Sequence, residues 1–75
     1  MIQPAEIERM ILDKMPGARV SVSDMTGTGD HFEITVVSAA FAGKPLIEQH
    51  RMLHAILETE MTDRIHAVKF RTRAS

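Results

Sequence analysis

Apolar residues recur with two different spacings along this chain, and each change of spacing predicts a new element. The first run has the three- and four-residue spacing of a helix that buries one face: Ile7, Met10, Ile11 and Met15. Pro4 suits the first turn of a helix because its nitrogen needs no hydrogen-bond partner there, and the Pro16-Gly17 pair ends the run. The pattern predicts a helix over residues 4–15.

Two stretches after this helix alternate apolar and polar residues, as half-buried strands do. They are ARVSVSDM at residues 18–25 and HFEITVVS at residues 31–38. The segment TGTGD between them has two glycines within five residues, which predicts a flexible hairpin loop. The two stretches are therefore predicted to pair as a hairpin.

The helical period returns after a short connection, AAFAGKP. Pro45 again suits a first turn, with Glu48 close behind, and the pattern predicts a helix from there to about residue 61. The stretch IHAVKFRT then predicts a strand with His66, Val68 and Phe70 on one face. The order α-β-β-α-β predicts a single α+β domain in which both helices pack on one face of a three-stranded mixed sheet.

The stretch HRMLH puts His50 and His54 four residues apart, a spacing at which two imidazoles on one helix can share a metal ion. On a helical wheel His50 falls in the middle of the apolar stripe and His54 near its edge. The stripe consists of Leu46, Ile47, Leu53, Leu57 and Met61. Arg51 points away and stands where a metalloprotease helix needs a glutamate. Both histidines are interpreted as core residues that pack the helix onto the sheet.

Composition narrows the class of protein. The 75 residues make one small domain without cysteine and with a formal net charge of −1. No apolar run approaches the roughly 20 residues of a membrane span, and the N-terminus lacks the segments of a signal peptide. A cytoplasmic protein with no membrane association is expected. No Ser-His-Asp set, paired carboxylates or phosphate-binding loop is evident, so an enzyme is not expected.

Four cationic residues are candidates for binding a partner or nucleic acid: Lys44, Arg51, Lys69 and Arg71. With helical spacing extended back to Lys44, Glu58 shares one exposed strip with Lys44 and Arg51, so an acid interrupts the basic line. Three phenylalanines and no other aromatic residue leave little for stacking on bases. These features favour a protein partner over DNA, and duplex binding is expected to be weak and salt-sensitive.

Two motifs resemble those of the BolA family of small stress-associated and iron–sulfur-related proteins. One is Phe41, then Gly43, then the His50-Arg51 step in a helix; the other is His66 followed by Ala67 at the start of the last strand. The likeness covers nearly the whole chain, so residues 1–75 are interpreted as one BolA-like domain. The resemblance implies a fold related to the class II KH type, which binds nucleic acid in other families.

The resemblance implies two functions. The first is partnership with a monothiol glutaredoxin, in which a [2Fe-2S] cluster is held between the two proteins and the glutaredoxin supplies its cysteine and a bound glutathione thiol. The isolated protein is then expected to be a monomer without the cluster, and a heterodimer with its partner. The second, alternative function is regulation of transcription by DNA binding through the helix-turn-helix-like segment around Phe41 to Leu57.

The resemblance also implies where cluster ligands lie. His66 is the first, and an imidazole is a suitable ligand for iron. The second ligand comes from the hairpin loop, where many relatives have a cysteine and this chain has Thr28. A threonine hydroxyl is a poor iron ligand at neutral pH. Asp30 and His31 are nearby, but His31 is predicted to point opposite to Phe32, and either residue could instead cap the hairpin.

Overall fold

The computed structural model describes residues 3–25, 27, 31–61 and 67–74. Its elements follow one another as α1 (Pro4–Lys14), β1 (Arg19–Asp24), β2 (His31–Val37), the 3-10 turn η1 (Ala39–Phe41), α2 (Leu46–Met61) and β3 (Ala67–Arg73). The predicted order of helices and strands is confirmed, and most ends agree with the predicted ones within one residue. Residues 65 and 66, which were predicted to begin the last strand, lie outside the described residues.

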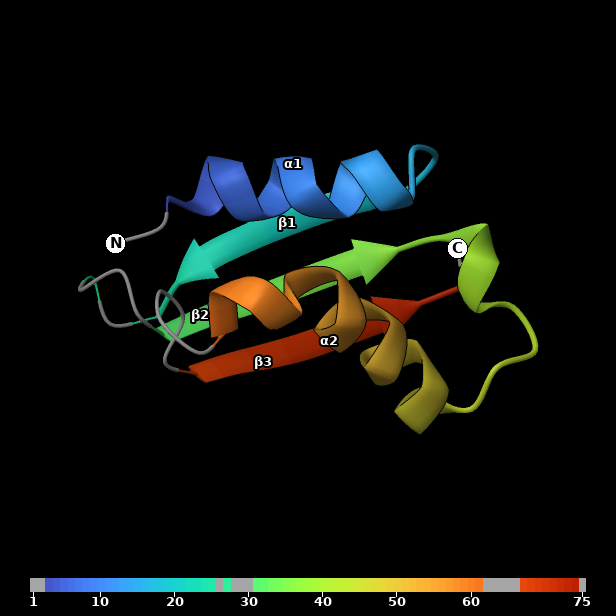
Figure 1. The fold of residues 1–75 in the computed structure, drawn as a ribbon. Helices are drawn as coiled ribbons and strands as arrows, with labels where there is room; N and C mark the ends of the chain where they lie inside the picture. The colour runs from blue at the N-terminus through green and yellow to red at the C-terminus, as the bar shows by residue number, and fades with distance from the viewer. Residues whose placement is uncertain (1–2, 26, 28–30, 62–66, 75) are drawn as a thin grey trace.

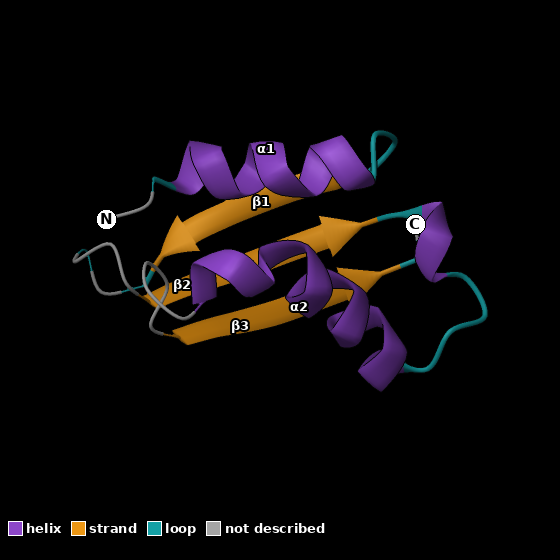
Figure 2. Cartoon of the chain, viewed as in Figure 1, coloured by secondary structure: helices purple, strands orange, loops and turns teal. Residues whose placement is uncertain are grey.

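The three strands form one mixed sheet in the order β1-β2-β3. β1 pairs with β2 antiparallel, and β3 pairs with β2 parallel because α2 carries the chain back before β3 begins. The register places Val22, Ile34 and Phe70 side by side across the sheet. Both helices cover the same face of the sheet, and the other face carries no helix (Figures 1 and 2). This confirms the predicted α+β architecture.

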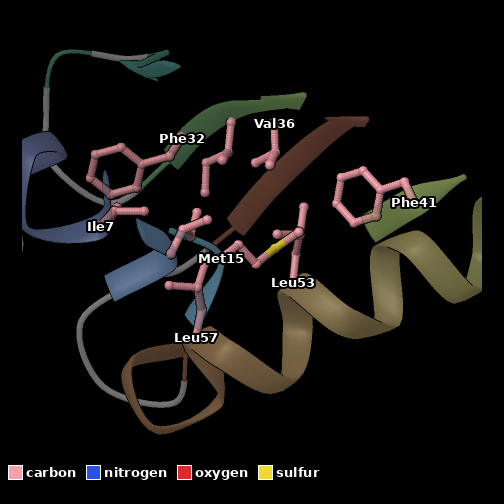
Figure 3. Close-up of a cluster of buried hydrophobic side chains, with 9 residues drawn as sticks. Ile7, Met15, Phe32, Val36, Phe41, Leu53 and Leu57 are labelled. Atoms are coloured by element: carbon pink, nitrogen blue, oxygen red, sulfur yellow. The ribbon is translucent and has the colours of Figure 1, made fainter. Parts of the chain in front are cut away.

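The core lies between the helices and this covered face of the sheet (Figure 3). Its buried apolar residues are Ile7, Ile11, Met15, Phe32, Ile34, Val36, Phe41, Leu53 and Leu57. The four-residue steps in α1 and α2 and the two-residue steps in β2 are the two periods that the sequence displays. At about 1.5–3 kcal/mol for each fully buried side chain, this small set supplies much of what holds the domain together.

The connection after β2 contains a 3-10 turn that the apolar pattern did not predict. The hydroxyl oxygen of Ser38 accepts a hydrogen bond from the backbone N–H of Ala40 at 3.1 Å, which caps this turn. The turn directs Phe41 into the core, where its side chain is fully buried. Gly43 then adopts a φ of 76°, a conformation that L side chains rarely adopt. In the Phe-x-Gly motif, the phenylalanine therefore packs in the core, and the glycine is required by its backbone conformation.

The first turn of α2 differs from the prediction. Leu46 and Ile47 were placed in the apolar stripe, yet they are 61% and 60% exposed, whereas Leu53 and Leu57 are fully buried. The helix begins at Leu46, and its first turn extends past β3 on the side away from β2 (Figure 1). Leu46 shares a helical face with Leu53, but its exposure shows that this face is left uncovered at the first turn.

Candidate functional site

The segments that carry the predicted cluster ligands are connected in the chain to strands at the same end of the sheet. In the parallel register His31 at the start of β2 pairs with Ala67 at the start of β3. The β1–β2 loop and the start of β3 therefore meet the described sheet at the same end (Figure 1). A parallel neighbour is required for this arrangement, because an antiparallel β3 would begin at the opposite end.

The described part of the hairpin loop is held by a local hydrogen bond. The Asp24 carboxylate accepts a hydrogen bond from the backbone N–H of Gly27 at 2.9 Å, and Gly27 has a φ of 75°. The backbone N–H of Met25 donates to the carbonyl of His31 at 2.8 Å. An aspartate that bonds to backbone N–H groups ahead of it stabilises a turn in this way. The base of the loop is consequently fixed next to β2.

Of the predicted ligands, His31 is the one that the structure describes. It is half-buried, whereas Phe32 beside it is fully buried, so the predicted opposite orientation of these two side chains is confirmed. His66, Thr28 and Asp30 lie outside the described residues. In the ranges that are described, no group of three or more His, Cys, Asp or Glu side chains is placed to hold a metal ion.

The four candidate partner-binding cations lie on two different parts of the molecule. Lys69 and Arg71 are exposed and alternate with half-buried residues of β3, so they lie on the face of the sheet that carries no helix. Lys44 lies in the connection before α2 and not on the helix, and Arg51 lies on α2. The predicted helical strip of Lys44, Arg51 and Glu58 is therefore wrong, because α2 begins only at Leu46.

Two of these cations are paired with carboxylates. The Arg51 guanidinium lies 3.2 Å from the Glu48 carboxylate one turn earlier on α2. The Nε of Arg71 donates to Oε2 of Glu33 at 3.0 Å across the exposed face of the sheet. Both ion pairs are largely exposed, so each contributes little to the free energy of unfolding. They do reduce the net positive charge that Arg51 and Arg71 offer to a partner.

The two histidines of α2 have different environments. The His50 ring packs edge-on against Phe70 of β3, with ring centroids 5.7 Å apart, and its Nε2 is buried without a hydrogen-bond partner among the described residues. His54 is exposed. The packing interpretation is thus confirmed for His50 and wrong for His54. With the His50 ring packed against β3 and the His54 side chain exposed, the pair does not form a two-histidine metal site.

Two cations outside the four candidates share with Lys69 and Arg71 the face of the sheet that carries no helix, called the open face below. Arg73 follows them at the same two-residue spacing on β3, and Arg19 lies on β1. Val37 pairs with both of these arginines, so all three lie in one row across the sheet. Alternation along the last strand could have identified Arg73, but Arg19 required the register between strands.

Comparison with known proteins agrees with this architecture. A family model described as BolA-like protein matches residues 7–75. Over 72 residues the chain is 39% identical to Protein BOLA2 of Arabidopsis thaliana, covering 95% of this chain and 76% of that protein. Over 79 residues it is 35% identical to a Vibrio cholerae protein named DNA-binding transcriptional regulator BolA, covering 96% of this chain and 74% of that protein.

A solved structure extends the likeness to three dimensions. BolA1 from Arabidopsis thaliana matches with a TM-score of 0.86, over 97% of this chain and 92% of that chain, at 18% identity. At that identity the likeness concerns the fold. Two helices on one face of a three-stranded mixed sheet, with this match, define a domain of the BolA type. The chain belongs to the BolA-like protein family.

Membership of this family bears on the class of protein. The two relatives compared above by sequence are named as a BolA protein and as a regulator, not as enzymes.

Among the described residues, no helix is both long enough and apolar enough to cross a bilayer.

Proposed function

We propose that this protein is a non-enzymatic partner of a monothiol glutaredoxin and that the two proteins hold a [2Fe-2S] cluster between them. The observation that carries the proposal is the parallel pairing of His31 with Ala67. Ala67 directly follows His66 in the chain, and the segment with Thr28 and Asp30 ends at His31. The chain thus enters β2 and β3 at the same end of the sheet, in each case directly after candidate ligands in the sequence.

The donor set of this chain supports a shared cluster. Imidazole nitrogens, as His66 and His31 offer, replace thiolates on one iron of Rieske centres. This chain has no cysteine, so it supplies no thiolate of its own. Thiolates must then come from the glutaredoxin cysteine and glutathione. Bound in this way, the cluster would serve iron–sulfur assembly, trafficking or iron and redox sensing, while the residues of this protein bind and orient it.

The test is co-purification of the protein with a monothiol glutaredoxin and glutathione, with and without iron and sulfide, followed by visible absorption spectra. We expect a mixed complex whose spectrum differs from that of the glutaredoxin alone. His66→Ala should alter or abolish that spectrum and leave the apo domain folded. His54→Ala is the matched control, because it removes an exposed imidazole from α2 and should change nothing. A wild-type spectrum and cluster lifetime in the His66→Ala complex would contradict the assignment of His66.

The second ligand is tested separately. Thr28→Ala, Asp30→Ala and His31→Ala each remove one candidate, and the variant that shortens the cluster lifetime identifies the ligand. If none of them does, this chain contributes one firm ligand, and the protein acts more as a regulator of its glutaredoxin than as a durable cluster holder.

DNA binding is a second candidate because one relative is named a DNA-binding transcriptional regulator. The placement of the cations favours it less. Lys44 and Arg51 lie in or before α2, Arg51 is paired with Glu48, and Lys69 and Arg71 lie on the open face of the sheet. Phosphate contacts depend on several cations acting together on one surface. A helix-turn-helix-like segment in which Arg51 is already paired would bind a duplex weakly.

A further inference from the structure

The outer edge of β3 combines three features that the proposed function does not use. First, β3 is an edge strand, since it pairs with β2 on one side and with no other described strand. Second, its exposed residues Lys69, Arg71 and Arg73 repeat every two residues on the open face of the sheet. Third, the exposed apolar residues Leu46 and Ile47 begin the turn of α2 that extends past this edge (Figure 1).

The direction of the β3 backbone groups can be assigned from one hydrogen bond. The backbone N–H of Ser38, the residue after β2, donates to the carbonyl of Arg73 at 3.0 Å, so the Arg73 backbone faces β2. Successive residues of a strand turn their N–H and C=O groups to alternate sides. The backbone groups of Val68, Phe70 and Thr72 therefore point outward, where a further strand could pair with them.

We propose that this edge binds an extended segment of a partner protein by strand addition, and that the segment alternates acidic and apolar residues. In a strand added at the usual spacing of about 4.8 Å, the side chains opposite Lys69, Arg71 and Arg73 share the open face with them. Carboxylates there would complement Lys69 and Arg73, and would compete with Glu33 for Arg71. The intervening side chains would face the helix layer beneath the first turn of α2, where Leu46 and Ile47 lie.

The charges favour an acidic and apolar strand over two other occupants of this edge, a second copy of this chain and a nucleic acid. Pairing β3 with β3 of a second copy would bring the same cations against one another, and like charges opposite each other destabilise a sheet. A nucleic acid backbone would use the cations alone, including Arg19 at the far edge, and would leave the outward N–H and C=O groups unpaired. Cations also protect edge strands from unwanted pairing. That role, however, does not account for two adjacent exposed apolar residues beside the edge.

The binding test uses neither a glutaredoxin nor a cluster, so its outcome does not depend on the proposed function. The probe is a labelled nine-residue peptide of alternating glutamate and valine, titrated with the full chain at low ionic strength and followed by fluorescence anisotropy. We expect saturable binding, with the largest amide NMR shifts at Val68, Phe70 and Thr72. Absence of binding would overturn the proposal and leave the cations as edge protection.

N-methylation of the peptide separates strand addition from charge attraction. One alternate set of peptide N–H groups faces β3 and the other faces away, and which set depends on whether the peptide lies parallel or antiparallel. Methylating the facing set should weaken binding at least tenfold, and methylating the other set less than twofold. Equal effects of the two sets would overturn the proposal.

Matched variants of the protein complete the test. The double variant Lys69→Glu with Arg73→Glu should weaken binding of the glutamate–valine peptide at least tenfold and should strengthen binding of a lysine–valine peptide. Arg19→Glu, on the same face, should change the affinity for either peptide less than twofold. Leu46→Ser should weaken binding severalfold, whereas Met25→Ser, at a residue 56% exposed beside the hairpin loop, should not. All these side chains are exposed, so the variants should fold, which their amide spectra would verify. If Arg19→Glu weakened binding as much as the β3 changes, the face would bind polyanions and the strand-addition proposal would be wrong.

Discussion

The imidazole ring of His50 meets the ring of Phe70 edge-on, with centroids 5.7 Å apart and ring planes inclined by 61°. This contact joins the first half of α2 to the middle of β3. It is formed by a polar residue whose Nε2 has no partner among the described residues, so the ring acts mainly through its packing.

We predict that His50→Ala lowers the free energy of unfolding by about 1–3 kcal/mol because the edge contact and buried ring volume are lost. His50→Phe should retain or raise stability, since it keeps an aromatic edge and removes the buried nitrogen without a partner. Chemical denaturation of the two variants measures both effects. Stoichiometric zinc in the untagged wild-type protein, abolished by His50→Ala, would instead show that the histidine is a ligand.

Gln49 is the second link between α2 and β3. Its amide Nε2 donates to the carbonyl of Lys44 at 2.8 Å, and its Oε1 accepts a hydrogen bond from the hydroxyl of Thr72. We predict that Gln49→Ala and Thr72→Val each cost about 1 kcal/mol of stability. The double variant should cost less than the sum of the two, because the Gln49–Thr72 bond is lost only once. Strict additivity in a double-mutant cycle would show that the two residues do not interact in solution.

Gly43 is required by its backbone conformation rather than by crowding. Its φ is +76°, and a Cβ built on it would meet no atom within 4 Å. We predict that Gly43→Ala lowers stability by about 1–2 kcal/mol, which is the cost of placing an L side chain in the left-handed region. Gly17→Ala is the control, since its Cβ would also meet nothing within 4 Å and its φ lies outside that region. Equal melting temperatures for the two variants would contradict this explanation.

At the proposed cluster site, Thr28→Cys should lengthen the lifetime of the mixed cluster that we propose with a glutaredoxin. A thiolate is a stronger iron ligand than a threonine hydroxyl. The decay of the visible absorption under air measures the lifetime, with Thr28→Ser as the control that keeps a hydroxyl. An unchanged lifetime would indicate that residue 28 does not reach the iron.

Duplex DNA binding through the helix-turn-helix-like segment should be weak and should fall steeply with salt, because that segment offers Lys44 and an Arg51 that is already paired with Glu48. Fluorescence anisotropy with duplexes of several sequences, at salt concentrations from about 0.05 to 0.2 M, measures affinity and specificity together. Arg51→Ala should change binding little, since Arg51 is already paired with Glu48. Sequence-specific binding that survives about 0.2 M salt and is lost in a folded Arg51→Ala variant would make regulation of transcription the leading function.

The apolar period alone predicted the element order, the covered face of β2 and the buried positions Leu53 and Leu57. It succeeded because a helix and a strand each bury one face, and the two periods differ enough to be recognised in a short chain. The same pattern was wrong for Leu46, Ile47 and His54. Periodicity indicates which way a side chain points from its own element, but not whether another element lies there to cover it.

Tertiary structure decided what the periods could not. The crossover through α2 makes β3 parallel to β2, and this register brings His31 beside Ala67 at one end of the sheet. It also aligns Arg19 and Arg73 on either side of Val37, although 54 positions separate the two arginines in the numbering. Such relationships depend on strand pairing between distant segments. A one-residue change in that pairing would move every side chain of β3 to the other face without altering the sequence.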